Sequence, residues 1–186
     1  MLTHKQQSFL ATLWLNDQPI NTLDTLIGKA AWVNRLGGAG VLPQLASTVR
    51  NDSHMLSCQA GISKKPMLFY FRQTPAGYRL YVREPGDHFG KGVWVHDHSH
   101  LGVVSTDQND PSAFALRSSE GQIVSLSDLA GDEHQITLTH NGLSVSKGRR
   151  SNSPYEYLKT RGDLSTVWTL KVLERSVPWL SSPYEI

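Results

Sequence analysis

The sequence predicts an all-β domain that is preceded by an N-terminal helical hairpin, and three observations lead to this prediction. The composition, with 39% hydrophobic and 18% charged residues, is typical of a folded globular chain. The 15 glycines and 9 prolines are spread along the chain and indicate many turns. Short strand-like segments recur in three similar stretches from about residue 46 onward, whereas the residues before them have helical spacing.

Residues 1–45 are predicted to form a helical arm. A first helix is expected over residues 3–16, because its apolar side chains cluster on one side. A second helix is expected over residues 22–36, where Thr22 can cap the start and Gly37 can cap the end. The apolar positions of the first helix are Phe9, Leu10, Leu13 and Trp14. Such stripes usually pack on a neighbouring domain; an oligomerising or membrane-active arm is the alternative.

The repeats lie in residues 46–176. In each repeat, a polar turn that ends in proline leads to an apolar strand, a glycine turn and an alternating strand, and one more strand precedes them. The prolines are Pro66, Pro111 and Pro154, and the glycines are Gly77, Gly121 and Gly162. A unit of about four short strands cannot bury its own apolar face, so the copies must bury it together.

Three such units resemble the β-trefoil, in which three four-stranded repeats build a six-stranded barrel capped by three hairpins. The resemblance covers residues 46–176 and implies that a first strand near Val49 pairs close to a last strand near Trp168, which closes the barrel. An eight-stranded or jelly-roll barrel is the alternative. Residues 177–186 form an apolar C-terminal tail that is expected to pack on the domain near the helices.

The densest histidine cluster of the chain follows a strand-like segment at Val93–Val95. His96, His98 and His100 alternate, so a regular strand would place all three imidazoles on one face. Imidazole is a common ligand for zinc, iron and copper. A metal site is therefore one interpretation, and a polar strand end at the surface is the other.

The segment His96-Asp97-His98 also resembles the His-x-His element of cupins, especially the thiol dioxygenases that hold iron with three histidines. The resemblance implies that His96 and His98 are ligands and that His140 is the third. It implies a metal-dependent dioxygenase with a metal ion as cofactor. The long polar turn over residues 105–111 departs from the cupin pattern.

Basic residues gather in two turns that occupy the same position in the first and third repeats. The turn at this position in the second repeat is acidic. A solvated loop is the common explanation for such residues. A site for an anionic partner, such as a sulfated glycan or an acidic protein surface, is the functional alternative. The candidate ligand-binding residues are Lys64, Lys65, Lys147, Arg149 and Arg150.

These features favour a non-enzymatic recognition module that binds a glycan or a protein through exposed turns and needs no cofactor. The cupin-type enzyme is the alternative, and an inhibitor or secreted effector is a third hypothesis. A net charge of +2 is too small to indicate nucleic-acid binding. The sequence has no long apolar run and no basic leader, so we expect no membrane-spanning segment and a cytoplasmic location, or export without a cleaved signal peptide. The ligand and the oligomeric state stay open.

Overall fold

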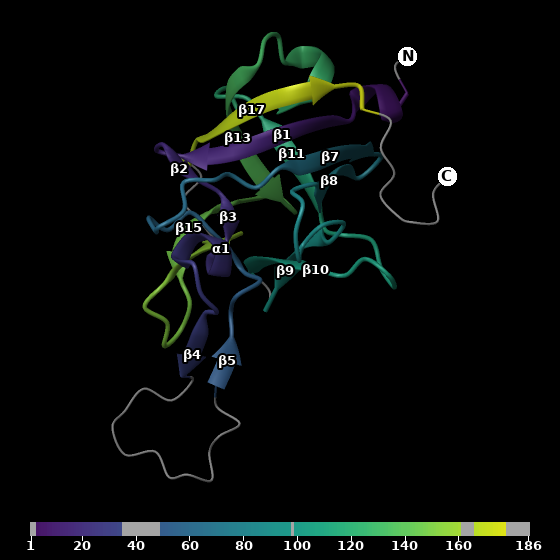
Figure 1. The fold of residues 1–186 in the computed structure, drawn as a ribbon. Helices are drawn as coiled ribbons and strands as arrows, with labels where there is room; N and C mark the ends of the chain where they lie inside the picture. The colour runs from purple at the N-terminus through teal and green to yellow at the C-terminus, as the bar shows by residue number, and fades with distance from the viewer. Residues whose placement is uncertain (1–2, 35–48, 98, 161–165, 178–186) are drawn as a thin grey trace.

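A computed structural model describes residues 3–34, 49–97, 99–160 and 166–177 (Figure 1). Its centre is a closed barrel of six antiparallel strands, in which each strand pairs with the next and the last pairs with the first. Around the barrel the strands follow the order of the chain. They are β1 (Phe9–Leu15), β7 (Phe69–Thr74), β8 (Gly77–Val82), β11 (Ala113–Arg117), β13 (Glu133–His140) and β17 (Trp168–Arg175).

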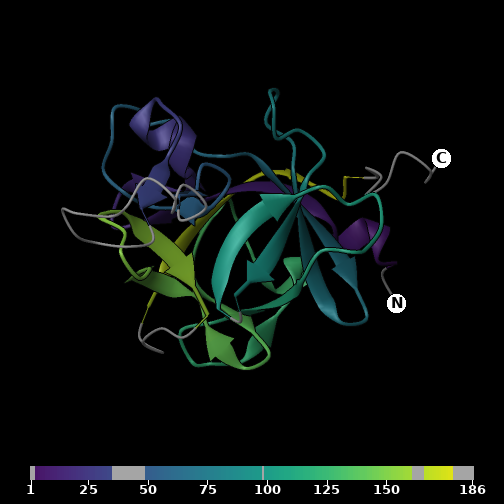
Figure 2. The ribbon, with the colours of Figure 1, turned by 90° about the horizontal axis from the view of Figure 1, so that it is seen from below.

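Three two-stranded hairpins cover one end of the barrel, which we call the hairpin end (Figures 1 and 2). They are β3 (Asn21–Thr22) with β6 (Leu56–Ser57), β9 (Gly92–His96) with β10 (His100–Val104), and β15 (Ser146–Arg149) with β16 (Glu156–Lys159). A ribbon of β4 (Trp32–Asn34) and β5 (Val49–Asn51) projects beyond this end. The remaining elements are the helix α1 (Leu23–Ile27), two 3-10 turns (Lys5–Gln7 and Leu126–Asp128), and the short strands β2 (Gln18–Pro19), β12 (Ile123–Val124) and β14 (Leu143–Ser144).

The hairpins bond to one another across the end of the barrel. The backbone N–H of Val103 in β10 donates to the carbonyl of His54, at 3.0 Å, just before β6. The Ser57 hydroxyl of β6 donates to the carbonyl of Glu156 in β16, at 2.7 Å. His100 of β10 pairs with Lys159 of β16. The three hairpins therefore form one connected layer.

Aromatic side chains fill the barrel between β1, β7 and β8. The rings of Phe9 and Phe71 stack with their centroids 4.7 Å apart, and Tyr78 packs edge-on against both. The turn between β7 and β8 ends at Gly77, where a Cβ would lie 2.5 Å from the carbonyl oxygen of Phe114. Glycine at this position therefore lets β11 approach β8 and close the ring. The strands predicted after Pro66 and at Gly77 are confirmed.

The predicted N-terminal helical hairpin is wrong. Residues 9–15 form barrel strand β1, and the second predicted helix is reduced to α1, which ends at Gly28 in a left-handed conformation (φ 71°). After residues 28–31, the chain continues into strand β4. Gly37, the predicted end of that helix, lies outside the described residues. Within the part of the chain that is described, no helix has the length and apolar content needed to cross a membrane.

Closure of the barrel also differs from the expectation. The strand at Val49 is β5, which pairs with β4 in the projecting ribbon, while β17 pairs with β1 and β13. The repeat pattern in the third unit is displaced as well, because the segment after Pro154 forms hairpin strand β16 rather than a barrel strand. Gly162 of that unit lies outside the described residues. Val177, the start of the predicted tail, is buried, and residues 178–186 lie outside the described residues.

Candidate functional site

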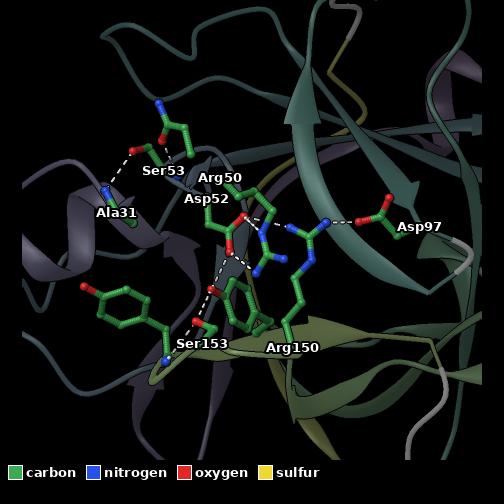
Figure 3. Close-up of polar contacts among 10 residues, drawn as sticks. Ala31, Arg50, Asp52, Ser53, Asp97, Arg150 and Ser153 are labelled. Carbon is green, nitrogen blue, oxygen red and sulfur yellow. Dashed lines mark hydrogen bonds and ion pairs between the residues drawn. The ribbon is translucent and has the colours of Figure 1, made fainter. Parts of the chain in front are cut away.

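A buried carboxylate, Asp52, lies where the projecting ribbon meets the β9–β10 and β15–β16 hairpins (Figure 3). Asp52 directly follows β5, and its side chain is fully buried. Its own backbone N–H donates to the carbonyl of Ala31, at 2.8 Å, and the backbone N–H of Ala31 donates to the hydroxyl of Ser53, at 2.9 Å. These bonds at the base of the β4–β5 ribbon fix the direction in which Asp52 points.

Donors from two distant parts of the chain converge on this carboxylate (Figure 3). Arg50 donates to both oxygens of Asp52, with Nε 2.7 Å from Oδ1 and Nη2 2.9 Å from Oδ2. Arg150 Nη1 lies 2.7 Å from Oδ1, and the Tyr157 hydroxyl lies 2.6 Å from Oδ2. Four donors occupy the carboxylate, which is about its full capacity as an acceptor. We call Arg50, Asp52, Arg150 and Tyr157 the Asp52 cluster.

The charges of the cluster set the ionisation of its members. Burial alone would raise the pKa of Asp52, but the hydrogen bonds from Arg50 and Tyr157 and the charge of Arg150 outweigh it, so its pKa lies below the usual value. Burial and the bond to the Asp52 carboxylate raise the pKa of Tyr157 to about 12. The Tyr157 hydroxyl therefore stays protonated and donates a hydrogen bond to Asp52. Its oxygen then accepts a hydrogen bond from the Ser153 hydroxyl, which is 2.5 Å away.

Arg150 links the cluster to the turn between β9 and β10. Its Nη2 forms an ion pair with Asp97, whose side chain is 60% exposed (Figure 3). Asp97 occupies the left-handed region (φ 45°), which aspartate tolerates better than most residues in a tight turn. The cluster thus joins the ribbon, the β9–β10 turn and the β15–β16 hairpin through one guanidinium and one carboxylate.

Histidines surround the cluster. The rings of His54 and His96 meet edge to face with their centroids 5.7 Å apart, and His100 packs similarly on Tyr157 at 6.0 Å. Burial lowers the pKa of all three imidazoles. Gly102 makes this packing possible, because a Cβ there would lie 3.1 Å from His96 Cδ2 and 3.2 Å from His54 Cδ2.

The structure separates the predicted metal ligands. His96 is at the end of β9 against His54, whereas His140 ends β13, where its Nδ1 is 2.8 Å from the carbonyl of Ala113. His98 lies outside the described residues. Within the described ranges, no group of three or more histidine, cysteine, aspartate or glutamate side chains is placed to hold a metal ion.

The predicted basic residues fall into two groups. Three of them pair with carboxylates: Lys65 with Glu84, Lys147 with Glu156 at 3.6 Å, and Arg150 within the Asp52 cluster. Lys64 and Arg149 are exposed. The two turns belong to different parts of the fold, since Lys64 precedes barrel strand β7 whereas Lys147 and Arg149 are in hairpin strand β15.

Sequence reasoning missed most of the Asp52 cluster. It singled out Arg150 as a surface residue and gave no role to Arg50, Asp52 or Tyr157. Asp52 and Arg150 are 98 residues apart in the sequence, so no local pattern connects them. Trp94, which also received no role, is half-buried in β9. The only local signal was a charged Arg-x-Asp element beside a strand.

Cys58 carries the one thiol of the sequence. It is a free, buried cysteine, and burial raises the pKa of its thiol to about 11. The thiol is therefore protonated at neutral pH, which makes it a poor nucleophile.

A scan against protein-family models gave no match, and searches of curated proteins and of solved structures gave none either. What the chain does has to be inferred from its own residues.

Proposed function

We propose that the chain is a non-enzymatic recognition module with β-trefoil architecture, and that it binds a glycan through the turns of its hairpin end. The order of the strands supports the trefoil. The six barrel strands follow the chain order, and one hairpin lies between β1 and β7, one between β8 and β11, and one between β13 and β17. A trefoil has this alternation of barrel strands and hairpins in each of its three units.

The observation that carries the functional proposal is the closed hydrogen bonding of the Asp52 cluster. All four donors to Asp52 come from the protein, so its oxygens are occupied and serve a framework role rather than that of a base or nucleophile. The cluster ties the hairpins and the ribbon together. Turns on such a fixed framework lose little conformational entropy when they bind, which favours recognition.

A glycan array that holds neutral, sialylated and sulfated glycans tests this function on the purified chain. Saturable binding to one class supports the proposal. Binding of sulfated glycans that weakens steeply between about 50 and 200 mM salt would assign the exposed Lys64, Lys147 and Arg149 as contacts. If no glycan of any class binds, and a chemical assay detects turnover of a small thiol with added iron, the cupin-type enzyme replaces this proposal.

A further inference from the structure

A hollow of about 380 Å³ lies beside the β9–β10 hairpin, at the low end of the size range of small-ligand sites. One wall is the end of strand β9, and the other is the loop that follows β10. We call it the Trp94 hollow. Its lining residues are Trp94, Val95, His96, Val104, Ser105, Asp107, Gln108 and Asn109.

The loop wall of the hollow is held in place from two sides. Gly92 of β9 lies so close to it that a Cβ would be 2.2 Å from Pro111 Cγ and 2.9 Å from Thr106 Cγ2. Arg79 of β8 donates to the carbonyl of Pro111 at 2.9 Å and forms an ion pair with Asp110 at 3.2 Å. Because the loop bonds to β8 and packs closely on β9, the hollow is already formed without a ligand.

Within this loop, the Ser105 hydroxyl orients Asp107, the acidic residue that lines the hollow. The Ser105 hydroxyl donates to Asp107 Oδ2 at 2.5 Å, and the backbone N–H of Asp107 lies 3.4 Å from the Ser105 oxygen. The second carboxylate oxygen of Asp107 keeps its acceptor capacity for another partner.

Two residues of the strand wall carry buried polar atoms without a hydrogen-bond partner among the described residues. These atoms are Nε1 of Trp94 and Nε2 of His96. A buried polar group without a partner costs free energy and calls for an explanation. Neither atom is exposed to the hollow, so a ligand there cannot reach them, and the site is assigned from the shape and lining of the hollow.

The chemistry of the lining selects the class of ligand. Trp94, Val95 and Val104 present apolar surface, and Gln108 and Asn109 each offer an amide donor and an amide acceptor. Among the lining residues the acidic Asp107 has no lysine or arginine beside it, so the local field disfavours an anion. The ligand that fits is neutral, has C–H faces that pack on an aromatic ring, and has hydroxyls on its edge.

We infer that the Trp94 hollow binds a neutral saccharide, with one sugar ring against Trp94 and its hydroxyls on Asp107, Gln108 and Asn109. This inference rests on the proposed recognition function and assigns it a site that differs from the basic turns.

The test uses the full chain and isothermal titration with defined neutral sugars: lactose, maltose, cellobiose, chitobiose and methyl mannoside. Sialyllactose and heparin serve as anionic comparisons. At least one neutral sugar is expected to bind, with little dependence on salt. Trp94→Ala should weaken that binding by at least about tenfold, as for an aromatic anchor at the centre of a contact. Trp32→Ala is the matched control, because Trp32 is 61% exposed on the β4–β5 ribbon, outside the hollow.

A second variant guards against a folding defect in Trp94→Ala. Gln108→Ala combined with Asn109→Ala changes only the loop wall and should also weaken binding at unchanged thermal stability. The inference is overturned if none of the neutral sugars binds, or if binding survives in both hollow variants. Binding of heparin alone, unaffected by Trp94→Ala, would reject the saccharide hollow and leave the recognition function in place. Failure of every sugar and every array glycan would reject both.

Discussion

The Asp52 cluster and the Trp94 hollow both lie near His96, but their polar groups are bonded differently. In the cluster, every oxygen of the central carboxylate is satisfied by protein donors. In the hollow, Trp94 and His96 keep polar atoms without a partner among the described residues, and the loop side chains face an open space. Saturated polar groups stabilise a framework, whereas polar side chains that line an open hollow keep hydrogen-bonding capacity for a ligand.

The contrast has a direct energetic consequence. Substitutions in the cluster should change the free energy of unfolding, because they leave buried charges without a partner. Substitutions in the loop wall of the hollow should change binding and leave stability nearly constant. The loss of stability should decrease from Asp52 through Tyr157 and the buried histidines to the exposed Lys147.

Asp52→Ala is expected to have the largest effect. It removes the carboxylate that both Arg50 and Arg150 bind and leaves the two guanidiniums close together, which costs about 3–5 kcal/mol for a buried pair. Urea unfolding followed by circular dichroism measures the loss. Asp97→Ala is the matched control, since Asp97 also pairs with Arg150 but is 60% exposed. Equal losses in the two variants would contradict the framework role of Asp52.

Tyr157→Phe is expected to lower the free energy of unfolding by about 1.5–3 kcal/mol, the range for a hydrogen bond to a charged group. The change removes only the hydroxyl that donates to Asp52 Oδ2, and the ring remains in place against His100. The same urea titration reports the loss. Tyr155→Phe, on the neighbouring half-buried tyrosine, should change stability much less. A loss below that of Tyr155→Phe would show that the hydroxyl contributes nothing.

As the pH falls, protonation of buried histidines should destabilise the hairpin end before Asp52 becomes protonated. Burial lowers the pKa of His54, His96 and His100 in the folded chain, whereas unfolded histidine titrates near 6.5. Below about pH 6.5 the unfolded chain therefore binds more protons, and stability falls as the pH drops further. Asp52 has a lowered pKa too, so its contribution is lost only below about pH 4.

Thermal unfolding between about pH 8 and pH 5 checks this sign, because ordinary carboxylates stay mostly ionised over this range while histidine titrates. The midpoint should fall toward pH 5. His54→Gln should flatten the fall, since it removes one of the three buried imidazoles. A midpoint that stays constant, or one that rises toward pH 5, would exclude the effect.

Lys147→Ala should change stability by less than about 1 kcal/mol, as is usual for an exposed ion pair. Its partner Glu156 is 3.6 Å away, and the side chains are 53% and 40% exposed. Arg150→Met, three residues along the chain, provides the contrast because it disrupts the buried cluster. Chemical denaturation of both variants shows whether these two basic residues, which look equivalent in the sequence, differ as the structure requires.

The sequence predicted the class of fold but not the strand that closes it. Residues 9–15 were expected to be helical because Phe9, Leu10, Leu13 and Trp14 fit a helical stripe. In the barrel most of β1 is buried, and a register shift between Leu10 and Ala11 interrupts simple alternation. A short, nearly continuous apolar run has no clear period, so its type depends on partners that are far away in the sequence.

The strands of the β7–β8 hairpin were predictable for a local reason, because a proline, an apolar run and Gly77 mark them directly. The Asp52 cluster was not, since its members come together only when the β15–β16 hairpin packs beside the ribbon. The acidic loop of the second repeat was noted in the sequence. Its proximity to Trp94 depends on the path of the loop after β10. That path is set by contacts with Arg79 and Gly92, which no local pattern in the sequence predicts.

The pairing of β1 with β17 has a consequence for how the chain acquires its fold. Phe9 lies opposite Arg175, and the backbone N–H of Val177 bonds to the carbonyl of Ser8 at 3.0 Å. During synthesis, strand β1 leaves the ribosome before the other barrel strands, and one of its edges stays uncovered until β17 has been made. Contacts between such distant residues slow folding, and an uncovered apolar strand invites association with other chains. Production of this protein should therefore benefit from slow synthesis at low temperature, and chaperones that shield the nascent N-terminal strand should raise its yield.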